Sequence, residues 1–179
     1  MTNTIDQNNE KREATLVRQA QEGSKEAFCE LYGLDTDRLY RSALYRLGDP
    51  DQAEDAVSDC VLAAWKDLGR LRTPSAFGGW IFRILHNICA GMIRKEIAGR
   101  ENLNRYYEQT QTQEGSSPLF SIELAEALAH LNDDERSVVL LSVVSGMTSK
   151  EISDITGLTP GAARSKLSRS LAKMRSFLS

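Results

Sequence analysis

The chain has 179 residues, of which 41% are hydrophobic and 26% charged, and its formal net charge is −3. This leaves room for one large or two small soluble domains. The polar opening stretch Thr2–Glu13 lacks the apolar core of a signal peptide, and no uninterrupted apolar run approaches membrane-spanning length. The three cysteines, Cys29, Cys60 and Cys89, are scattered singly and form no paired framework, so we expect them to be small core residues. We therefore expect a cytoplasmic protein without membrane insertion.

The first part of the chain has the spacing of helices. We expect residues 1–11 to be disordered and a first helix to run from about Arg12 to Gln21. Ser24 can cap a second helix, and apolar residues then recur at helical spacing as far as Leu47. No segment of the chain alternates in the manner of a strand, so the sequence predicts an all-α fold.

Gly48-Asp49-Pro50 marks the start of a further helix, with Asp49 as its cap and Pro50 as its first residue. One face of this helix is apolar from Ala53 to Trp65. The other face is acidic and carries Asp51, Glu54, Asp55 and Asp59. An acidic helix face is available to a protein partner, and it accounts in part for the negative net charge.

The middle of the chain contains a loop, a helix and a linker. We expect a loop over residues 70–79 and a helix over residues 80–97. Residues 99–117 have almost nothing to bury, which is typical of a flexible linker between two helical domains. The expected domains therefore cover residues 12–98 and residues 118–179.

The second domain carries the most informative pattern. Residues 132–135 and residues 148–151 each have the sequence of a capping box. The second box opens a short helix, and after a turn at Gly157 the residues Thr159 and Pro160 open another. Two short helices joined by a glycine-bearing turn predict a helix-turn-helix motif.

The last helix combines an apolar face with a cationic face. Its apolar residues recur at helical spacing: Ala163, Leu167, Leu171 and Met174. No acidic residue occurs from Pro160 to the C-terminus, and such a helix suits a DNA major groove bordered by phosphates. A solvated basic face is the plainer alternative. The expected DNA contacts are Arg164, Ser165 and Arg169 to base edges or phosphates, with Lys150 and Lys166 as backbone anchors.

Two stretches resemble the sigma-70 family of bacterial RNA polymerase sigma factors. Residues 49–57, Trp65 and residues 75–87 resemble their second conserved region, and residues 131–174 resemble their fourth. Nothing sizeable separates the two, as in the extracytoplasmic-function group. The resemblance implies a subunit that binds core RNA polymerase, directs it to promoters and helps to melt the DNA. It does not imply an enzyme.

The resemblance also implies roles for single residues. The polymerase contacts, to the clamp helices of the largest subunit, would be Asp51, Glu54, Asp55, Ser58 and Asp59. The −10 contacts would be Leu71, Ser75, Phe77, Arg83, His86 and Asn87, with Arg94 and Lys95 near phosphates. The second domain would read the −35 element near the polymerase flap region. A dedicated anti-sigma protein would hold the factor inactive.

Two other functions compete with this one. A one-component regulator would use the same C-terminal helices to bind DNA tightly without polymerase. A third alternative is a sigma-like chain that only sequesters a partner, which the departures from the family's usual residues at Ser58, Leu71 and Gly91 leave open. His86 and Cys89 lie one helical turn apart, but no second ligand pair exists, so we expect no metal site, no cofactor and no catalytic residue.

Overall fold

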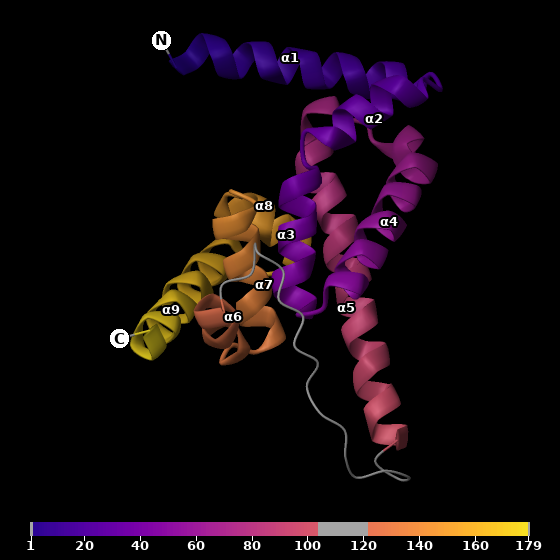
Figure 1. Cartoon of the computed structure of the whole chain (residues 1–179). Helices are drawn as coiled ribbons and strands as arrows, with labels where there is room; N and C mark the ends of the chain where they lie inside the picture. Colours follow the sequence, from indigo (N-terminus) through magenta and orange to yellow (C-terminus); the bar gives the residue numbers. More distant parts are fainter. Residues whose placement is uncertain (1, 104–121, 179) are drawn as a thin grey trace.

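The computed structural model describes residues 2–103 and 122–178, and every regular element in these two ranges is a helix (Figure 1). The all-α prediction is confirmed. Residues 104–121, which include most of the expected linker and the expected start of the second domain, lie outside the described residues.

Residues 2–103 form the first unit, in which three helices lie side by side as a bundle and another lies across its end (Figure 1). The helices are α1 (Thr2–Gln21), α2 (Lys25–Gly33), α3 (Thr36–Leu47), α4 (Pro50–Asp67) and α5 (Phe77–Leu103). Two 3₁₀ turns connect α4 to α5, namely η1 (Leu68–Arg70) and η2 (Pro74–Ala76). Helices α3, α4 and α5 make up the bundle, and α1 packs across it beside α2.

Residues 122–178 form the second unit, which lies against α3 and α5 (Figure 1). Its elements are α6 (Ile122–Ala129), α7 (Asp133–Val139), the π-helical turn η3 (Leu140–Val144), α8 (Ser149–Thr156) and α9 (Pro160–Leu178). Gly157 separates α8 from α9 with a left-handed φ of 76°, a conformation that glycine adopts without steric cost. The predicted helix-turn-helix is therefore present as α8 and α9.

The predicted caps are confirmed. The Asp49 carboxylate accepts a hydrogen bond from the backbone N–H of Gln52 at 3.0 Å, and Pro50 follows it at the start of α4. Both capping boxes are complete, at the start of α7 and at the start of α8. These side chains satisfy backbone groups that a helix end leaves without a partner, so the sequence determines these helix starts locally.

Two predicted boundaries are corrected. Helix α1 begins at Thr2 rather than at about Arg12, so residues 2–11 are helical where disorder was expected. Nucleation is the costly step of helix formation, and a helix that is already packed extends upstream at little cost. Helix α5 likewise runs from Phe77 to Leu103 instead of from 80 to 97, so residues 99–103 of the expected linker are helical.

One hydrophobic core continues from the first unit into the second. Leu39 of α3 and Phe82 of α5 belong to the same buried cluster as Leu141 of η3 and Ile152 of α8. A smaller cluster inside the second unit includes Leu128 and Met174. The two units therefore pack on each other, and this contact places the predicted functional residues.

One described stretch, Pro74–Gly99, is long and apolar enough in composition to cross a membrane, with a mean hydropathy of 1.2. Its large apolar residues Phe77, Ile81 and Phe82 are buried in the core of the first unit. The core helix of a soluble bundle has the same composition, so this stretch is weak evidence for a membrane span.

The cap of α8 can be tested by Thr148→Ala, which removes the hydroxyl that accepts a hydrogen bond from the Glu151 backbone N–H at 3.3 Å. We expect the free energy of unfolding to fall by about 1 kcal/mol, the usual cost of a lost N-cap. Urea denaturation followed by circular dichroism measures this change. Thr148→Ser keeps the hydroxyl and is the control, and an equal loss in both variants would contradict the cap.

Candidate functional site

Helix α4 turns its apolar residues to the bundle and its acidic residues to solvent. Ala53, Ala56 and Cys60 are fully buried. All five predicted polymerase contacts are exposed on the opposite side: Asp51, Glu54, Asp55, Ser58 and Asp59. Leu62, which the sequence did not single out, extends this surface one turn further and is 68% exposed. We call these six residues the acidic face of α4.

Helix α9 presents the predicted cationic residues. Arg164, Ser165 and Arg169 are exposed, and the Arg169 Nε donates to the Ser165 carbonyl at 3.2 Å. Ala163 on the other side of the helix is buried. Lys166 is half-buried, with its Nζ 3.4 Å from a carboxylate oxygen of Asp134. The helix therefore offers two arginines and a serine to an external partner.

The predicted −10 residues lie around η2 and along α5. Five of them are exposed: Ser75, Arg83, Asn87, Arg94 and Lys95. Leu71, just after η1, is 8% exposed. The Gln21 side chain of α1 donates hydrogen bonds to the carbonyls of Leu68 at 3.0 Å and Leu71 at 2.8 Å. Helix α1 thus holds the segment that leads to η2, a role that no sequence motif indicated.

The prediction that Phe77 contacts DNA is corrected, because this side chain is fully buried. Its ring packs against that of Trp80, with the ring centroids 6.0 Å apart. Phe77 begins the apolar stripe that continues through Ile81 and Leu85 toward the core. The spacing of four residues between these positions was the signal for burial.

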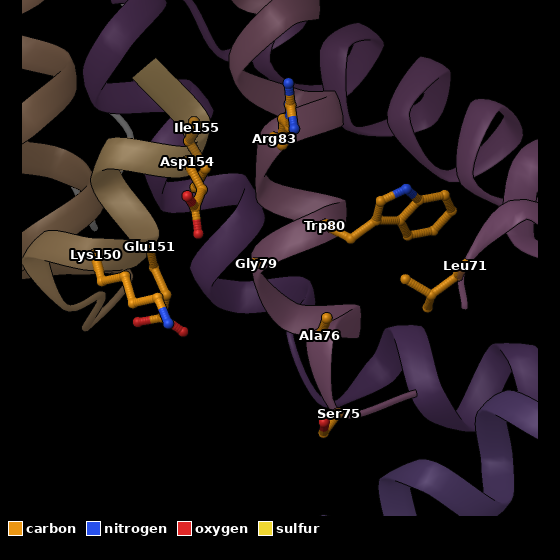
Figure 2. Close-up of a pocket in the computed structure, with 10 residues that line it drawn as sticks. All are labelled: Leu71, Ser75, Ala76, Gly79, Trp80, Arg83, Lys150, Glu151, Asp154 and Ile155. Atoms are coloured by element: carbon orange, nitrogen blue, oxygen red, sulfur yellow. The ribbon is translucent and has the colours of Figure 1, made fainter. Parts of the chain in front are cut away.

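A pocket of about 430 Å³ lies where the two units meet. The first unit supplies Leu71, Ser75, Ala76, Gly79, Trp80 and Arg83. Helix α8 supplies Lys150, Glu151, Asp154 and Ile155. Figure 2 shows the α8 side chains on one side of this space and the residues of η2 and α5 on the other. Residues expected to read the −10 element therefore face Lys150, which was expected to contact the −35 element.

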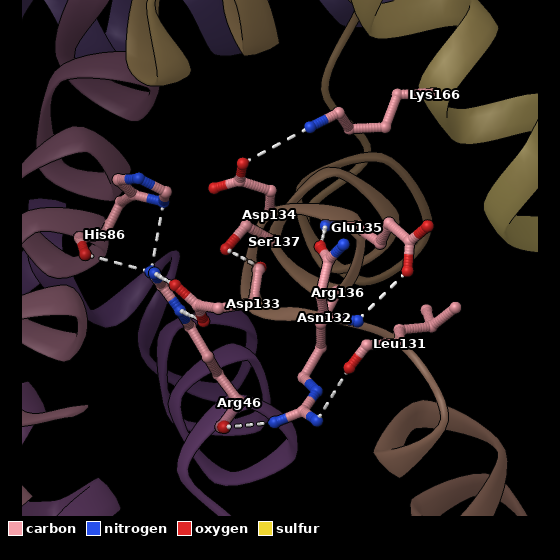
Figure 3. Close-up of polar contacts among 10 residues, drawn as sticks. All are labelled: Arg46, His86, Leu131, Asn132, Asp133, Asp134, Glu135, Arg136, Ser137 and Lys166. Atoms are coloured by element: carbon pink, nitrogen blue, oxygen red, sulfur yellow. Dashed lines mark hydrogen bonds and ion pairs between the residues drawn. The ribbon is translucent and has the colours of Figure 1, made fainter. Parts of the chain in front are cut away.

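Beside this pocket, a buried arginine joins the two units (Figure 3). Arg46, at the end of α3, is 5% exposed, and its guanidinium donates to both carboxylate oxygens of Asp133, from Nε at 3.1 Å and from Nη2 at 2.9 Å. Its Nη1 donates to the His86 carbonyl at 2.9 Å and lies 3.1 Å from the His86 Nδ1. Arg136 of α7 donates in turn to the Arg46 carbonyl at 3.3 Å. We call Arg46, His86 and Asp133 the Arg46 cluster.

His86 is half-buried in this cluster and does not face solvent as a DNA contact would. Because arginine only donates, the His86 Nδ1 accepts and the imidazole is neutral. Burial, followed by the charge of Arg46, lowers the pKa of His86 to about 4. Burial alone would raise the pKa of Asp133, but the hydrogen bonds and charge of Arg46 outweigh it and hold this pKa below its usual range. The charges of the cluster are therefore fixed at neutral pH.

Within residues 2–103 and 122–178, no group of three or more His, Cys, Asp or Glu side chains is arranged to hold a metal ion. Cys60 and Cys89 are core residues, as expected, and burial raises the pKa of their thiols to about 12 and about 11. Cys29 is exposed, contrary to its expected place in the core.

Two family models match this chain. Sigma-70 region 2 matches residues 31–97, and sigma-70 region 4 matches residues 121–174. The chain belongs to the sigma-70 family. The region 2 match contains the acidic face of α4 and most of the pocket, and the region 4 match contains the helix-turn-helix. Members of this family are sigma factors, which are not enzymes.

Relatives of this sigma factor belong to the extracytoplasmic-function group. The ECF RNA polymerase sigma factor SigW of Bacillus subtilis is 24% identical over 178 residues, which cover 90% of this chain and 94% of SigW. The structure of CnrH in complex with the cytosolic domain of CnrY matches with a TM-score of 0.72 and 26% identity, over 93% of this chain and 97% of that chain. The sigma factor RpoE in complex with the anti-sigma factor NepR from Bartonella quintana also gives a TM-score of 0.72, at 25% identity, over 84% and 96%. This chain is an ECF sigma factor that directs transcription to promoters.

Lowering the pH should destabilise this sigma factor through His86. Its pKa is about 4 in the folded chain against an ordinary value of 6.5, so the unfolded chain binds more protons between these values. We expect the free energy of unfolding to decrease as the pH falls from 6.5 to 4, and urea denaturation over this range measures it.

The His86→Gln variant should have a shallower pH dependence than the parent chain, because it removes the titrating ring. The neighbouring exposed Asn87 has no titrating group, so Asn87→Gln is the matched control and should leave the slope unchanged. Equal slopes for the parent chain and His86→Gln would contradict this role of His86.

Proposed function

We propose that this sigma factor docks on core RNA polymerase through the acidic face of α4, with the clamp helices of the largest subunit as the contact. Four carboxylates and Ser58 are exposed together there, while the opposite side of the helix is buried. Such a surface favours a basic partner, and the exposed Leu62 adds an apolar contact that a solvated face would not need. The exposure of this face is the observation that carries the proposal.

Promoter recognition is assigned to two surfaces. The −10 element would contact Ser75, Arg83, Asn87, Arg94 and Lys95, with Leu71 in the wall of the pocket. A pocket of about 430 Å³ has the size of a ligand site and can hold an unstacked base beside the Trp80 ring. The −35 element would contact Arg164, Ser165 and Arg169, with Lys150 and Lys166 as backbone anchors. The second unit would also lie near the polymerase flap region.

We further propose that the factor acts in the cytoplasm, without a cofactor, a catalytic residue or insertion into a membrane. Sigma factors are soluble transcription proteins and are generally cytoplasmic. Four of the large apolar residues of the Pro74–Gly99 stretch, Phe77, Ile81, Phe82 and Leu85, are packed in the core of the first unit, which supports a soluble chain.

Control by an anti-sigma factor is proposed from the two solved relatives. RpoE is bound to the anti-sigma factor NepR in its structure, and CnrH is bound to the cytosolic domain of CnrY. A protein that co-purifies with this sigma factor from its source cells should prevent the purified factor from binding core polymerase. Co-purification of polymerase alone would count against a dedicated anti-sigma factor.

Reversing the charge of the α4 face tests the docking proposal. The double variant Asp55→Lys with Asp59→Lys should lower specific transcription by core polymerase at least tenfold, because the coupling of close charge pairs at protein interfaces exceeds about 1.5 kcal/mol. Transcription with purified core polymerase, with start sites mapped on genomic DNA, measures it. The control reverses two exposed carboxylates of the first unit away from α4, Glu22 and Glu26.

Equal transcription from both double variants would contradict the α4 assignment. An absence of specific starts, together with tight DNA binding by the chain without polymerase, would instead favour the one-component regulator.

Alanine substitutions on α9 separate the two kinds of DNA contact. If Arg164 or Arg169 reads a base, its loss should cost about 1–3 kcal/mol and relax specificity at one −35 position. A lost phosphate contact should weaken binding to all sequences and reduce the salt slope by about 1. Both effects are measured by the binding of the holoenzyme to promoters with altered −35 sequences, over a range of salt concentrations. The control is Arg18→Ala, which removes an exposed arginine of the first unit. Unchanged binding in both variants would contradict the assignment of α9.

A further inference from the structure

The end of helix α1 holds the segment that connects α4 to α5. The side-chain amide of Gln21, the last residue of α1, donates to the carbonyl oxygens of Leu68 at 3.0 Å and Leu71 at 2.8 Å. A glutamine amide has two N–H donors, so one side chain can hold both carbonyls. Leu68 begins the turn η1 and Leu71 follows it directly. We call these two hydrogen bonds the Gln21 brace.

The position of Gln21 is fixed by the core of the first unit. Ala20 beside it is buried, and Gly23 turns the chain after α1 with a left-handed φ of 102°. In α2, the ring of Phe28 packs against that of Trp65, with the ring centroids 5.1 Å apart. Trp65 lies in the last turn of α4, directly before η1. Helix α2 therefore joins the end of α1 to the end of α4, and this packing sets the place from which Gln21 reaches η1.

The segment that Gln21 holds leads to the proposed −10 surface. Leu71 belongs to the core and lines the pocket (Figure 2). Residues 72–76 follow it and include the exposed Ser75, and we call them the η2 loop. Phe77 then returns the chain to the core, where it is fully buried. The η2 loop is therefore anchored at Leu71 and at Phe77, and Gln21 fixes the backbone at the first of these anchors.

We propose that Gln21 is a positioning residue for recognition of the −10 element, because the brace sets where the chain enters the η2 loop. A side chain that binds a partner has to be held within about 0.5 Å of its productive position by the residues around it. An exposed residue such as Ser75 has few packing contacts of its own and depends on the anchors of its loop. The recognition role rests on the proposed −10 function, whereas the brace is a property of the free chain.

The plainer role for these hydrogen bonds is to stabilise the fold. Although Gln21 is exposed, both bonds are partly buried, so their loss would also lower stability. A loss of stability reduces the amount of active factor equally for every promoter. A displaced η2 loop instead changes the preference of the factor among −10 sequences. The ratio of transcription from two promoters therefore separates the two roles.

The brace is tested by Gln21→Glu in the full chain. This variant keeps the shape of the side chain, but at neutral pH its carboxylate has no donor and faces two carbonyl oxygens. The matched control is Gln19→Glu, which makes the same change at an exposed residue of the same helix turn. A further variant, Gln21→Lys, keeps N–H donors at this position and should restore the function that the carboxylate removes.

Two measurements then apply. Amide hydrogen exchange of the free chain reports whether residues 68–76 have loosened, and we expect faster exchange there in Gln21→Glu but not in α7. Transcription with purified core polymerase uses a mapped promoter and versions with one base pair changed in the −10 or the −35 element. The parent chain should favour the unaltered −10 element about tenfold, as is usual for one altered base pair. Gln21→Glu should lose most of this preference and keep the −35 preference, whereas Gln19→Glu and Gln21→Lys should match the parent chain.

Unchanged exchange of residues 68–76 in Gln21→Glu would overturn the brace. Faster exchange with an unchanged −10 preference would overturn the positioning role. The same would follow from an equal loss of the −10 and −35 preferences, or from an equal −10 loss in Gln19→Glu or Gln21→Lys. A parent chain without any −10 preference would overturn the proposed −10 function and the positioning role with it, and the exchange result would still decide whether the brace exists.

Discussion

The arrangement of this sigma factor depends on one buried guanidinium. Arg46 connects three elements, because it binds the first turn of α7 through Asp133 and the backbone of α5 through His86. Removing one partner of a buried pair leaves an uncompensated charge, which is strongly unfavourable. The two units also share an apolar core, which includes Phe82 of α5 and Ile152 of α8. This core supplies the contact area between the units, and Arg46 gives that contact a defined geometry.

The exposed charges also differ between the two units. A net charge of −3 is unusual for a protein that binds DNA by itself, because the negative phosphate backbone binds proteins with a positive net charge more tightly. In this chain the negative charge is exposed on α4 and the positive charge on α9, on different units. Each charged surface therefore suits a different partner, one a basic protein surface and the other DNA.

The sequence predicted the features that local chemistry determines. Capping boxes, the Asp49-Pro50 start and the Gly157 turn act over three or four residues, and all of them occur in the structure. The exposure of the acidic residues on α4 followed from helical periodicity alone. The family resemblance gave the order of the functional regions, and the matches to regions 2 and 4 agree with it.

What the sequence missed depends on contacts between distant residues. Arg46 and Asp133 are 87 positions apart, and no spacing rule joins them. His86 was assigned to DNA from its place in a motif, but its side chain faces Arg46 of α3 inside the first unit. Phe77 was assigned in the same way, although its spacing to Ile81 and Leu85 already indicated the core. A motif identifies positions, and only the packing shows which way a side chain points.

The central claim is that the acidic face of α4 docks this sigma factor on core RNA polymerase. The most direct measurement is the affinity of the chain for purified core polymerase, by fluorescence anisotropy with a dye on the exposed Ser176. The account predicts that Asp55→Lys with Asp59→Lys binds at least tenfold more weakly than the parent chain, whereas reversal of Glu22 and Glu26 leaves the affinity unchanged. Equal affinities of the two double variants would contradict it.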